Sequence, residues 1–137
     1  MKKTLFTAMT ICAALTACNT NKVTVTDFSA QIPGKWTILT AGDQTTENVE
    51  EKPFINFSDS GTVNGYAAVN TFFGSYTAKE DSLSFSNLGM TMMAGPDMDR
   101  EMAIMQAINS SKTIAIQGDT LLMKNAEGNT VMTLKRD

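Results

Sequence analysis

The sequence of 137 residues contains no histidine and only two cysteines, Cys12 and Cys18. Without an imidazole, the Ser–His and Cys–His nucleophile pairs and the commonest zinc ligand sets are excluded. Positive charge is also scarce, because 11 basic residues face 14 acidic ones, whereas a nucleic-acid-binding face needs an excess of basic residues. We therefore expect a protein that is not an enzyme, has no metal site or cofactor and binds no nucleic acid.

The N-terminus has the features of a bacterial secretory signal. Lys2 and Lys3 precede an uncharged run from Leu5 to Leu15, which is too short to span a bilayer permanently. The run ends in Leu15-Thr16-Ala17-Cys18, which resembles the cleavage site of bacterial lipoproteins. This resemblance implies that residues 1–17 form a signal peptide and that Cys18 carries palmitate and other lipid chains. The alternative is an ordinary signal peptide with an incidental cysteine.

Cleavage before Cys18 would remove two lysines, lowering the basic count from 11 to 9 and the net charge from −3 to −5. The lipid would anchor the protein in the bacterial cell envelope, with the outer membrane favoured and the domain in the periplasm or at the cell surface. The polar residues 18–30 are typical of a tether, in which Val23 and Val25 alternate with threonine as in a short strand. Residues 31–137 are long enough for one monomeric domain.

Short strand-forming runs separated by turn residues fill most of that domain. Together with one helix they predict an α+β, mostly β fold: a small curled antiparallel sheet or partly open barrel of about eight strands with the helix packed on it. The predicted strands include Trp36–Thr40, Phe54–Phe57, Thr62–Tyr66, Thr71–Thr77, Ser82–Ser86, Thr113–Gln117, Thr120–Lys124 and Thr130–Leu134.

The helix is predicted over residues 96–109, with Pro96 in its first position. Acidic side chains at 97, 99 and 101 are explained by the positive end of the helix dipole more simply than by a catalytic carboxylate cluster. Apolar residues recur at intervals of three and four, so one face should lie on the sheet and line a candidate apolar groove. The residues of this face are Met98, Met102, Met105 and Ile108.

Methionine is unusually dense in this region, because six of the ten methionines fall within residues 90–105. Their spacing favours packing in a plastic core between helix and sheet. Two alternatives stay open: a pliable groove for an apolar peptide or lipid, and a soft thioether site for Cu(I).

Two blocks of the domain resemble the META domain family. One runs from Asn64 to Tyr76; the other runs from Thr91 to Gly95 and leads into Asp99-Arg100-Glu101. The resemblance implies a small β-rich α+β fold, no catalytic residues, a role in envelope stress or integrity and a groove for a partner's hydrophobic segment. We expect mainly structural roles for the matching residues, which are Trp36, Gly65, Asn70, Phe72, Gly74, Tyr76, Thr91, Met93 and Glu101.

The chain departs from the family pattern at two positions. Val69 and Gly95 stand where the family has cysteines. The joint loss of both suggests that the family cysteines form a disulfide, since an orphaned thiol in an oxidising compartment invites mispairing. We therefore expect Val69 and Gly95 to lie close enough in space for such a bridge.

The sequence thus predicts an envelope-anchored protein that binds an envelope protein segment or a lipid through apolar surface. The alternative is a lipocalin-like carrier of a small hydrophobic ligand. Gly34-Lys35-Trp36 and Arg136 are similar to the Gly-x-Trp and C-terminal arginine of lipocalins, in which the arginine stacks on the tryptophan. A carrier would need a cavity lined by Trp36, Phe72 and the methionines.

Overall fold

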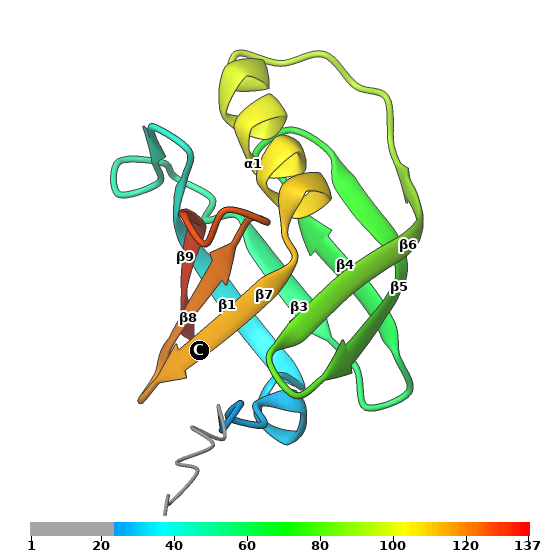
Figure 1. Ribbon diagram of the computed structural model, residues 1–137. Helices are drawn as coiled ribbons and strands as arrows, with labels where there is room; N and C mark the ends of the chain where they lie inside the picture. Colours follow the sequence, from blue (N-terminus) through cyan, green and yellow to red (C-terminus); the bar gives the residue numbers. More distant parts are fainter. Residues whose placement is uncertain (1–23) are drawn as a thin grey trace, which may run out of the picture.

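The computed structural model describes residues 24–137, which form a small antiparallel β-barrel with one α-helix (Figure 1). The 3-10 helix η1 spans Ser29–Gln31 and the α-helix α1 spans Met98–Ser110. The strands are β1 (Gly34–Ala41), β2 (Gln44–Thr45), β3 (Phe54–Phe57), β4 (Thr62–Tyr66), β5 (Thr71–Lys79), β6 (Ser82–Met90), β7 (Thr113–Gln117), β8 (Thr120–Lys124) and β9 (Thr130–Arg136).

Hydrogen bonds join the strands in the order β2-β1-β3-β4-β5-β6-β7-β8-β9, and an additional pairing of β1 with β9 closes the ring. Eight strands thus form a closed barrel, and β2 is an extra strand on β1. The closing pairs run from Trp36 opposite Arg136 to Ala41 opposite Met132. The predicted mostly β fold with about eight strands and one helix is confirmed.

Strand pairing in the barrel is least extensive between β6 and β7. Ser82 opposite Thr113 is the one register pair that joins these strands within residues 24–137. The helix α1 connects them in sequence and covers the upper end of the barrel in Figure 1. The helix is therefore inserted between the two neighbouring strands that share the fewest register pairs.

The helix packs on the barrel through Glu101, Ile104, Ala107 and Ile108, which are all buried. The predicted apolar face was wrong in its phase: Met98 and Met102 are exposed and Met105 is half-buried. The helix also begins at Met98, so Pro96 precedes the first turn. Ile108, the fourth residue of the predicted face, is buried as expected, and it shares the buried face with Ile104, Ala107 and the hydrogen-bonded carboxylate of Glu101, described below.

The lower end of the barrel is closed by η1 and Ile32, which is fully buried. The indole N–H of Trp36 donates to the Ile32 carbonyl at 2.8 Å. The Arg136 guanidinium lies 4.1 Å from the Trp36 ring centroid and donates to the carbonyls of Pro33 and Gln31. This confirms the predicted stacking of arginine on tryptophan and shows that it ties the last strand to the lower plug.

Replacing Arg136 by leucine should lower the free energy of unfolding by about 2 kcal/mol, because a cation–π contact and two hydrogen bonds to carbonyls are lost together. The matched control Lys135→Leu changes an exposed side chain on the same strand and should stay within about 0.5 kcal/mol of the parent. Urea unfolding followed by Trp36 fluorescence measures both. Equal losses in the two variants would contradict this role of Arg136.

Large side chains fill the interior of the barrel between the two plugs. Those that are fully buried include Trp36, Phe57, Phe72, Ile38, Ile55, Leu83, Leu121, Met123 and Met132. Trp36 and Phe72, which a carrier would need as cavity lining, are therefore part of a packed core.

The predicted signal peptide, Cys18 and Val23 lie outside the described residues. Residues 24–28 are not a strand, and Val25 is exposed. Phe28, assigned to the tether from the sequence, donates its N–H to the Glu80 carbonyl at 3.0 Å and packs against the core. Within residues 24–137, no helix is long and apolar enough to cross a membrane.

Candidate functional site

A buried polar network links the loop before β5 to the helix. Glu101, 5% exposed, accepts hydrogen bonds from the Asn70 backbone N–H at 2.6 Å and from the Asn70 amide Nδ2 at 2.9 Å. Asn70 is itself buried. The helix dipole was the reason expected from the sequence for an acidic residue at position 101. In the structure, the Glu101 carboxylate accepts hydrogen bonds from a residue 31 positions away.

The same asparagine holds the segment between β6 and α1. Its Oδ1 accepts from the Thr91 hydroxyl at 2.8 Å and from the Met93 N–H at 2.7 Å. Its Nδ2 also donates to the Met93 carbonyl at 2.9 Å, and Thr91 Oγ1 accepts from the Thr71 N–H at 3.2 Å. The structure thus brings Asn70, Thr91, Met93 and Glu101 together, as a clamp on residues 91–93.

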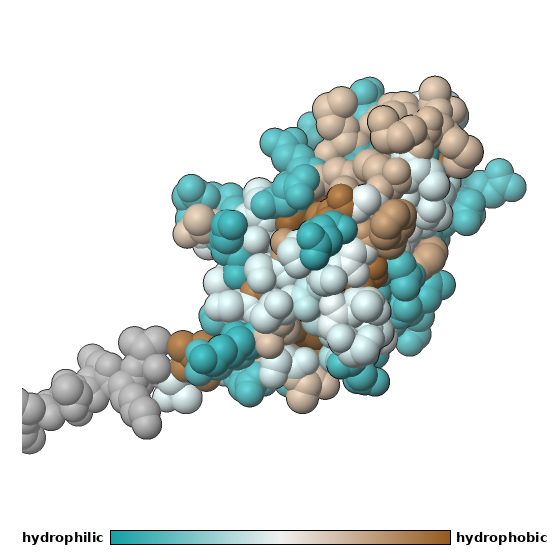
Figure 2. Space-filling view, turned by 90° about the vertical axis from the view of Figure 1, so that its right-hand side faces the viewer, coloured by the Kyte–Doolittle hydropathy of each residue, from teal (hydrophilic) through white to brown (hydrophobic). Residues whose placement is uncertain are grey.

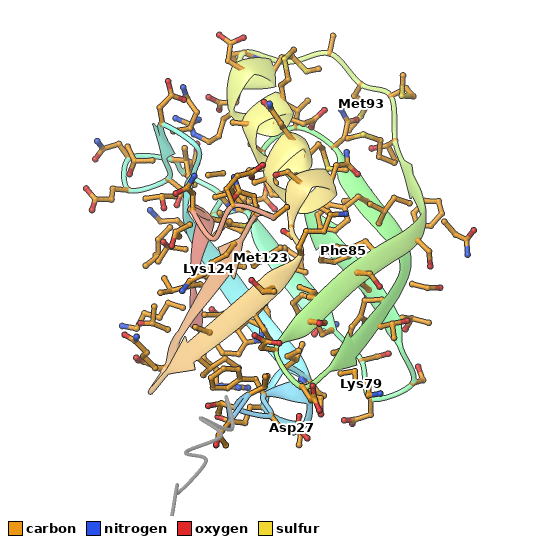
Figure 3. The ribbon with its side chains drawn as sticks, in the orientation of Figure 1. Asp27, Lys79, Phe85, Met93, Met123 and Lys124 are labelled. Carbon is orange, nitrogen blue, oxygen red and sulfur yellow. The ribbon has the colours of Figure 1, made fainter. Side chains whose placement is uncertain are left out.

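The clamp uses only backbone atoms of Met93, so the Met93 side chain is left outside the barrel (Figure 3). Around it the structure exposes four methionines, which we call the methionine surface: Met92 (91% exposed), Met93 (61%), Met98 (38%) and Met102 (67%). Figure 2 shows moderately hydrophobic residues gathered at the upper end of the molecule.

The methionine cluster is therefore divided. The predicted core packing is wrong for the four methionines of the surface, whereas Met123 and Met132 are fully buried and Met90 and Met105 pack partly against the core. For Met92 and Met93 the sequence pattern failed because polar atoms fix the backbone of residues 91–93, whatever the hydropathy of the side chains. Met98 and Met102 are exposed because the helix buries Glu101, Ile104, Ala107 and Ile108 instead.

An open pocket of about 430 Å³ lies beside the start of the helix and is lined by Glu50, Glu51, Tyr66, Val69 and Asp97 among others. Burial raises the pKa of Tyr66, and the charges of Glu51, Asp97 and Glu101 raise it further. Its hydroxyl therefore stays protonated and donates to the Ala68 carbonyl at 2.7 Å. Among residues 24–137, no group of three acidic, histidine or cysteine side chains is arranged to hold a metal ion.

Comparison with known proteins decides the family. The META domain model matches residues 29–137. The chain belongs to the META domain family. Among solved structures, the NMR structure of a protein from Burkholderia xenovorans shares 23% identity at a TM-score of 0.63, covering 80% of this chain and 86% of that one.

Other structures share the META-domain fold seen here. The crystal structure of a DUF4847 family protein from Bacteroides vulgatus has 13% identity and a TM-score of 0.57, covering 77% of this chain and 94% of that one. No curated protein matches. At these identities the structures show the fold alone.

The glycines and aromatic residues of the META motif have packing roles. A Cβ on Gly65 would lie 2.2 Å from the Phe54 carbonyl oxygen and 2.5 Å from the Phe72 ring, and one on Gly74 would lie 2.9 Å from Leu88. The Tyr76 hydroxyl donates to the Ser58 carbonyl at 2.6 Å, and its ring packs edge-on against Phe57. Burial, and then the charge of Asp59, raises the pKa of Tyr76.

Val69 and Gly95, the two positions at which the sequence suggested a lost disulfide, lie side by side. A Cβ built on Gly95 would be 3.7 Å from the Val69 Cβ and 3.0 Å from its Cγ1. The first distance is typical of a disulfide. The expected proximity is confirmed, and the branched side chain of Val69 occupies the space that a second side chain at position 95 would need.

Proposed function

We propose that this chain is a non-catalytic, lipid-anchored META protein of the bacterial cell envelope, which docks an apolar segment of another envelope protein on its methionine surface. The observation that carries the proposal is the exposure of Met92, Met93, Met98 and Met102 around one clamped segment. Flexible, polarizable thioethers adapt to differently shaped apolar partners. Contiguous apolar surface on a small domain is typical of interaction sites.

The position of the surface favours a protein partner over the anchoring membrane. The first described residues enter at the lower end of the barrel, where Phe28 bonds to Glu80 at the β5–β6 turn. The helix and the segment that joins it to β6, which together carry the four methionines, are at the upper end (Figure 1). An anchor at Cys18 would therefore leave the methionines facing away from the lipid, where another protein can reach them.

The packed core gives less support to the carrier alternative. Trp36 and Phe72 are buried among other side chains, and neither lines the pocket beside the helix start. Docking on an outer surface requires no internal cavity.

The anchor is tested with Cys18→Ser in intact cells. Loss of the lipidated sulfur should move the protein from the membrane fraction to the soluble secreted fraction, because no acyl chain then holds it. The parent protein and a Thr20→Ser variant, which changes a neighbouring residue, are the controls. Persistence of Cys18→Ser in the membrane fraction would refute the lipid anchor.

Docking is tested by placing a photocrosslinking amino acid at position 99, beside the methionine surface, or at position 119, at the β7–β8 turn. Position 99 should give a discrete crosslinked envelope protein in intact cells, whereas position 119 should not. Met102→Glu should reduce the crosslinking yield from position 99 at least about fivefold, since a charge opposes apolar docking. Val25→Glu, an apolar-to-acidic change at the other end of the molecule, should leave the yield unchanged. The same products from both positions would overturn the proposal.

A further inference from the structure

The exposed thioethers differ from the rest of the domain in their chemical reactivity. Residues 24–137 contain eight methionines but no cysteine or histidine, so no thiol or imidazole competes for a two-electron oxidant. The tryptophan, Trp36, is fully buried. Oxidation of methionine follows exposure, and four of these sulfur-containing side chains stand on one surface while two are sealed in the core.

We propose that the methionine surface is a reversible oxidation site, at which hypochlorous acid converts the thioethers of Met92, Met93, Met98 and Met102 to sulfoxides while the barrel stays folded. The oxygen atom of hypochlorous acid is transferred to sulfur. The sulfur loses two electrons, chlorine is reduced from the +1 state to chloride, and the proton of the acid is released. Each thioether consumes one molecule of oxidant.

The fold should survive because the oxidised atoms are outside the packed structure. The Asn70 side chain binds the backbone N–H and carbonyl of Met93, and neither of these backbone groups changes when the sulfur is oxidised. Met123 and Met132 are fully buried, and their sulfoxides would disrupt the core. Figure 3 places Met93 on the segment above the barrel and Met123 on β8 in its wall.

Oxidation would also change what the surface binds. A sulfoxide is polar and accepts hydrogen bonds, so the same four side chains would no longer offer apolar area. Docking of an apolar segment would then be lost until methionine sulfoxide reductases restore the thioethers. This consequence rests on the proposed docking function, whereas the oxidation site itself does not.

The oxidation site is tested by titrating the folded protein with hypochlorous acid and mapping sulfoxides by mass spectrometry after tryptic digestion. Cleavage after Lys79, Arg100, Lys112 and Lys124 separates the surface methionines from the buried ones. Sulfoxide at positions 92, 93 and 102 should form at least about tenfold faster than at 123 and 132, with the near-ultraviolet circular dichroism unchanged. Similar rates at all positions, or loss of the circular dichroism before surface sulfoxides accumulate, would overturn the proposal.

Matched variants assign the reaction to the surface. The quadruple variant M92L/M93L/M98L/M102L keeps apolar side chains and should lose the fast phase of oxidant consumption. The double variant M123L/M132L should keep that phase in full. A fast phase that persists in the quadruple variant would place the reactive groups elsewhere and contradict the proposal.

The effect on docking is read separately, from crosslinking at position 99 before oxidation, after oxidation and after treatment with reductases specific for the two sulfoxide epimers. Yield should fall at least about fivefold and return on reduction. Selective sulfoxide formation with an unchanged yield would refute control of docking by oxidation. Absence of any crosslinked partner from the unoxidised protein would instead refute the docking function and leave the oxidation site standing.

Discussion

Replacing Glu101 by alanine is expected to lower the free energy of unfolding by about 3 kcal/mol, because two buried donors of Asn70 lose a charged acceptor. The Asn70 backbone N–H would have no other acceptor in the described structure, since its hydrogen bond goes to Glu101 Oε2. For a domain of this size, such a loss corresponds to a fall in Tm of about 15 °C. Urea and thermal unfolding followed by Trp36 fluorescence measure it.

Asp99→Ala is the matched control for Glu101→Ala. Both carboxylates lie in the first turn of α1, but Asp99 is exposed and Glu101 is buried. A role limited to the helix dipole predicts similar small losses, about 0.5 kcal/mol each. The network predicts a large loss for Glu101 alone, so equal effects would contradict it.

Glu101→Gln separates charge from geometry. Glutamine keeps one oxygen to accept from Asn70 Nδ2, but its amide NH₂ group would face the Asn70 N–H. We expect a loss between those of Asp99→Ala and Glu101→Ala. A stability equal to that of the parent would show that the carboxylate charge and its second oxygen contribute nothing.

Introducing cysteines at positions 69 and 95 is expected to raise the free energy of unfolding by about 3 kcal/mol once the disulfide forms. A bridge between these positions closes a loop of 25 intervening residues, for which the chain-entropy treatment gives about that gain. The Cβ separation of 3.7 Å suits the bond, and Gly95 is not in the left-handed region. Unfolding is measured in a C12S/C18S background, so that no other thiol competes.

The oxidised and reduced forms of V69C/G95C are compared with each single variant. The reduced protein should show no gain, because it lacks the crosslink and has lost the Val69 packing. Gly95→Cys alone should be destabilised, since its Cβ would lie 3.0 Å from Val69 Cγ1. Failure of the double variant to lose both thiols in air, as counted with a thiol reagent, would contradict the proximity of the two positions.

The hairpins could be predicted from the sequence because their signals are local. Alternating apolar residues and turn residues such as Gly61 and Gly118, both with positive φ, identify neighbouring strands within about ten residues. Local patterns could not show that β1 pairs with β9, 100 positions later. The lipocalin-like arginine and tryptophan indicated that Arg136 stacks on Trp36, but not which strands pair.

The candidate site was harder to predict than the fold. The motif residues Asn70, Thr91 and Glu101 were identified from the sequence, but their joint network depends on contacts 21 to 31 positions apart. Hydrophobic periodicity placed Met98 and Met102 on the core face, whereas the buried face consists of Ile104, Ala107 and Ile108 together with the hydrogen-bonded Glu101. A polar residue that interrupts an apolar stripe, as Glu101 does, was the signal available.

The pairing of β1 with β9 has a consequence for how the protein is made. The barrel closes only when the seven residues of the last strand, Thr130–Arg136, have reached the first strand, and Arg136 completes the lower plug at the same step. Such long-range pairing makes folding slow and dependent on the complete chain. We therefore expect a chain that still lacks Thr130–Arg136 to stay unfolded, so that synthesis of the last strand is the step that permits folding.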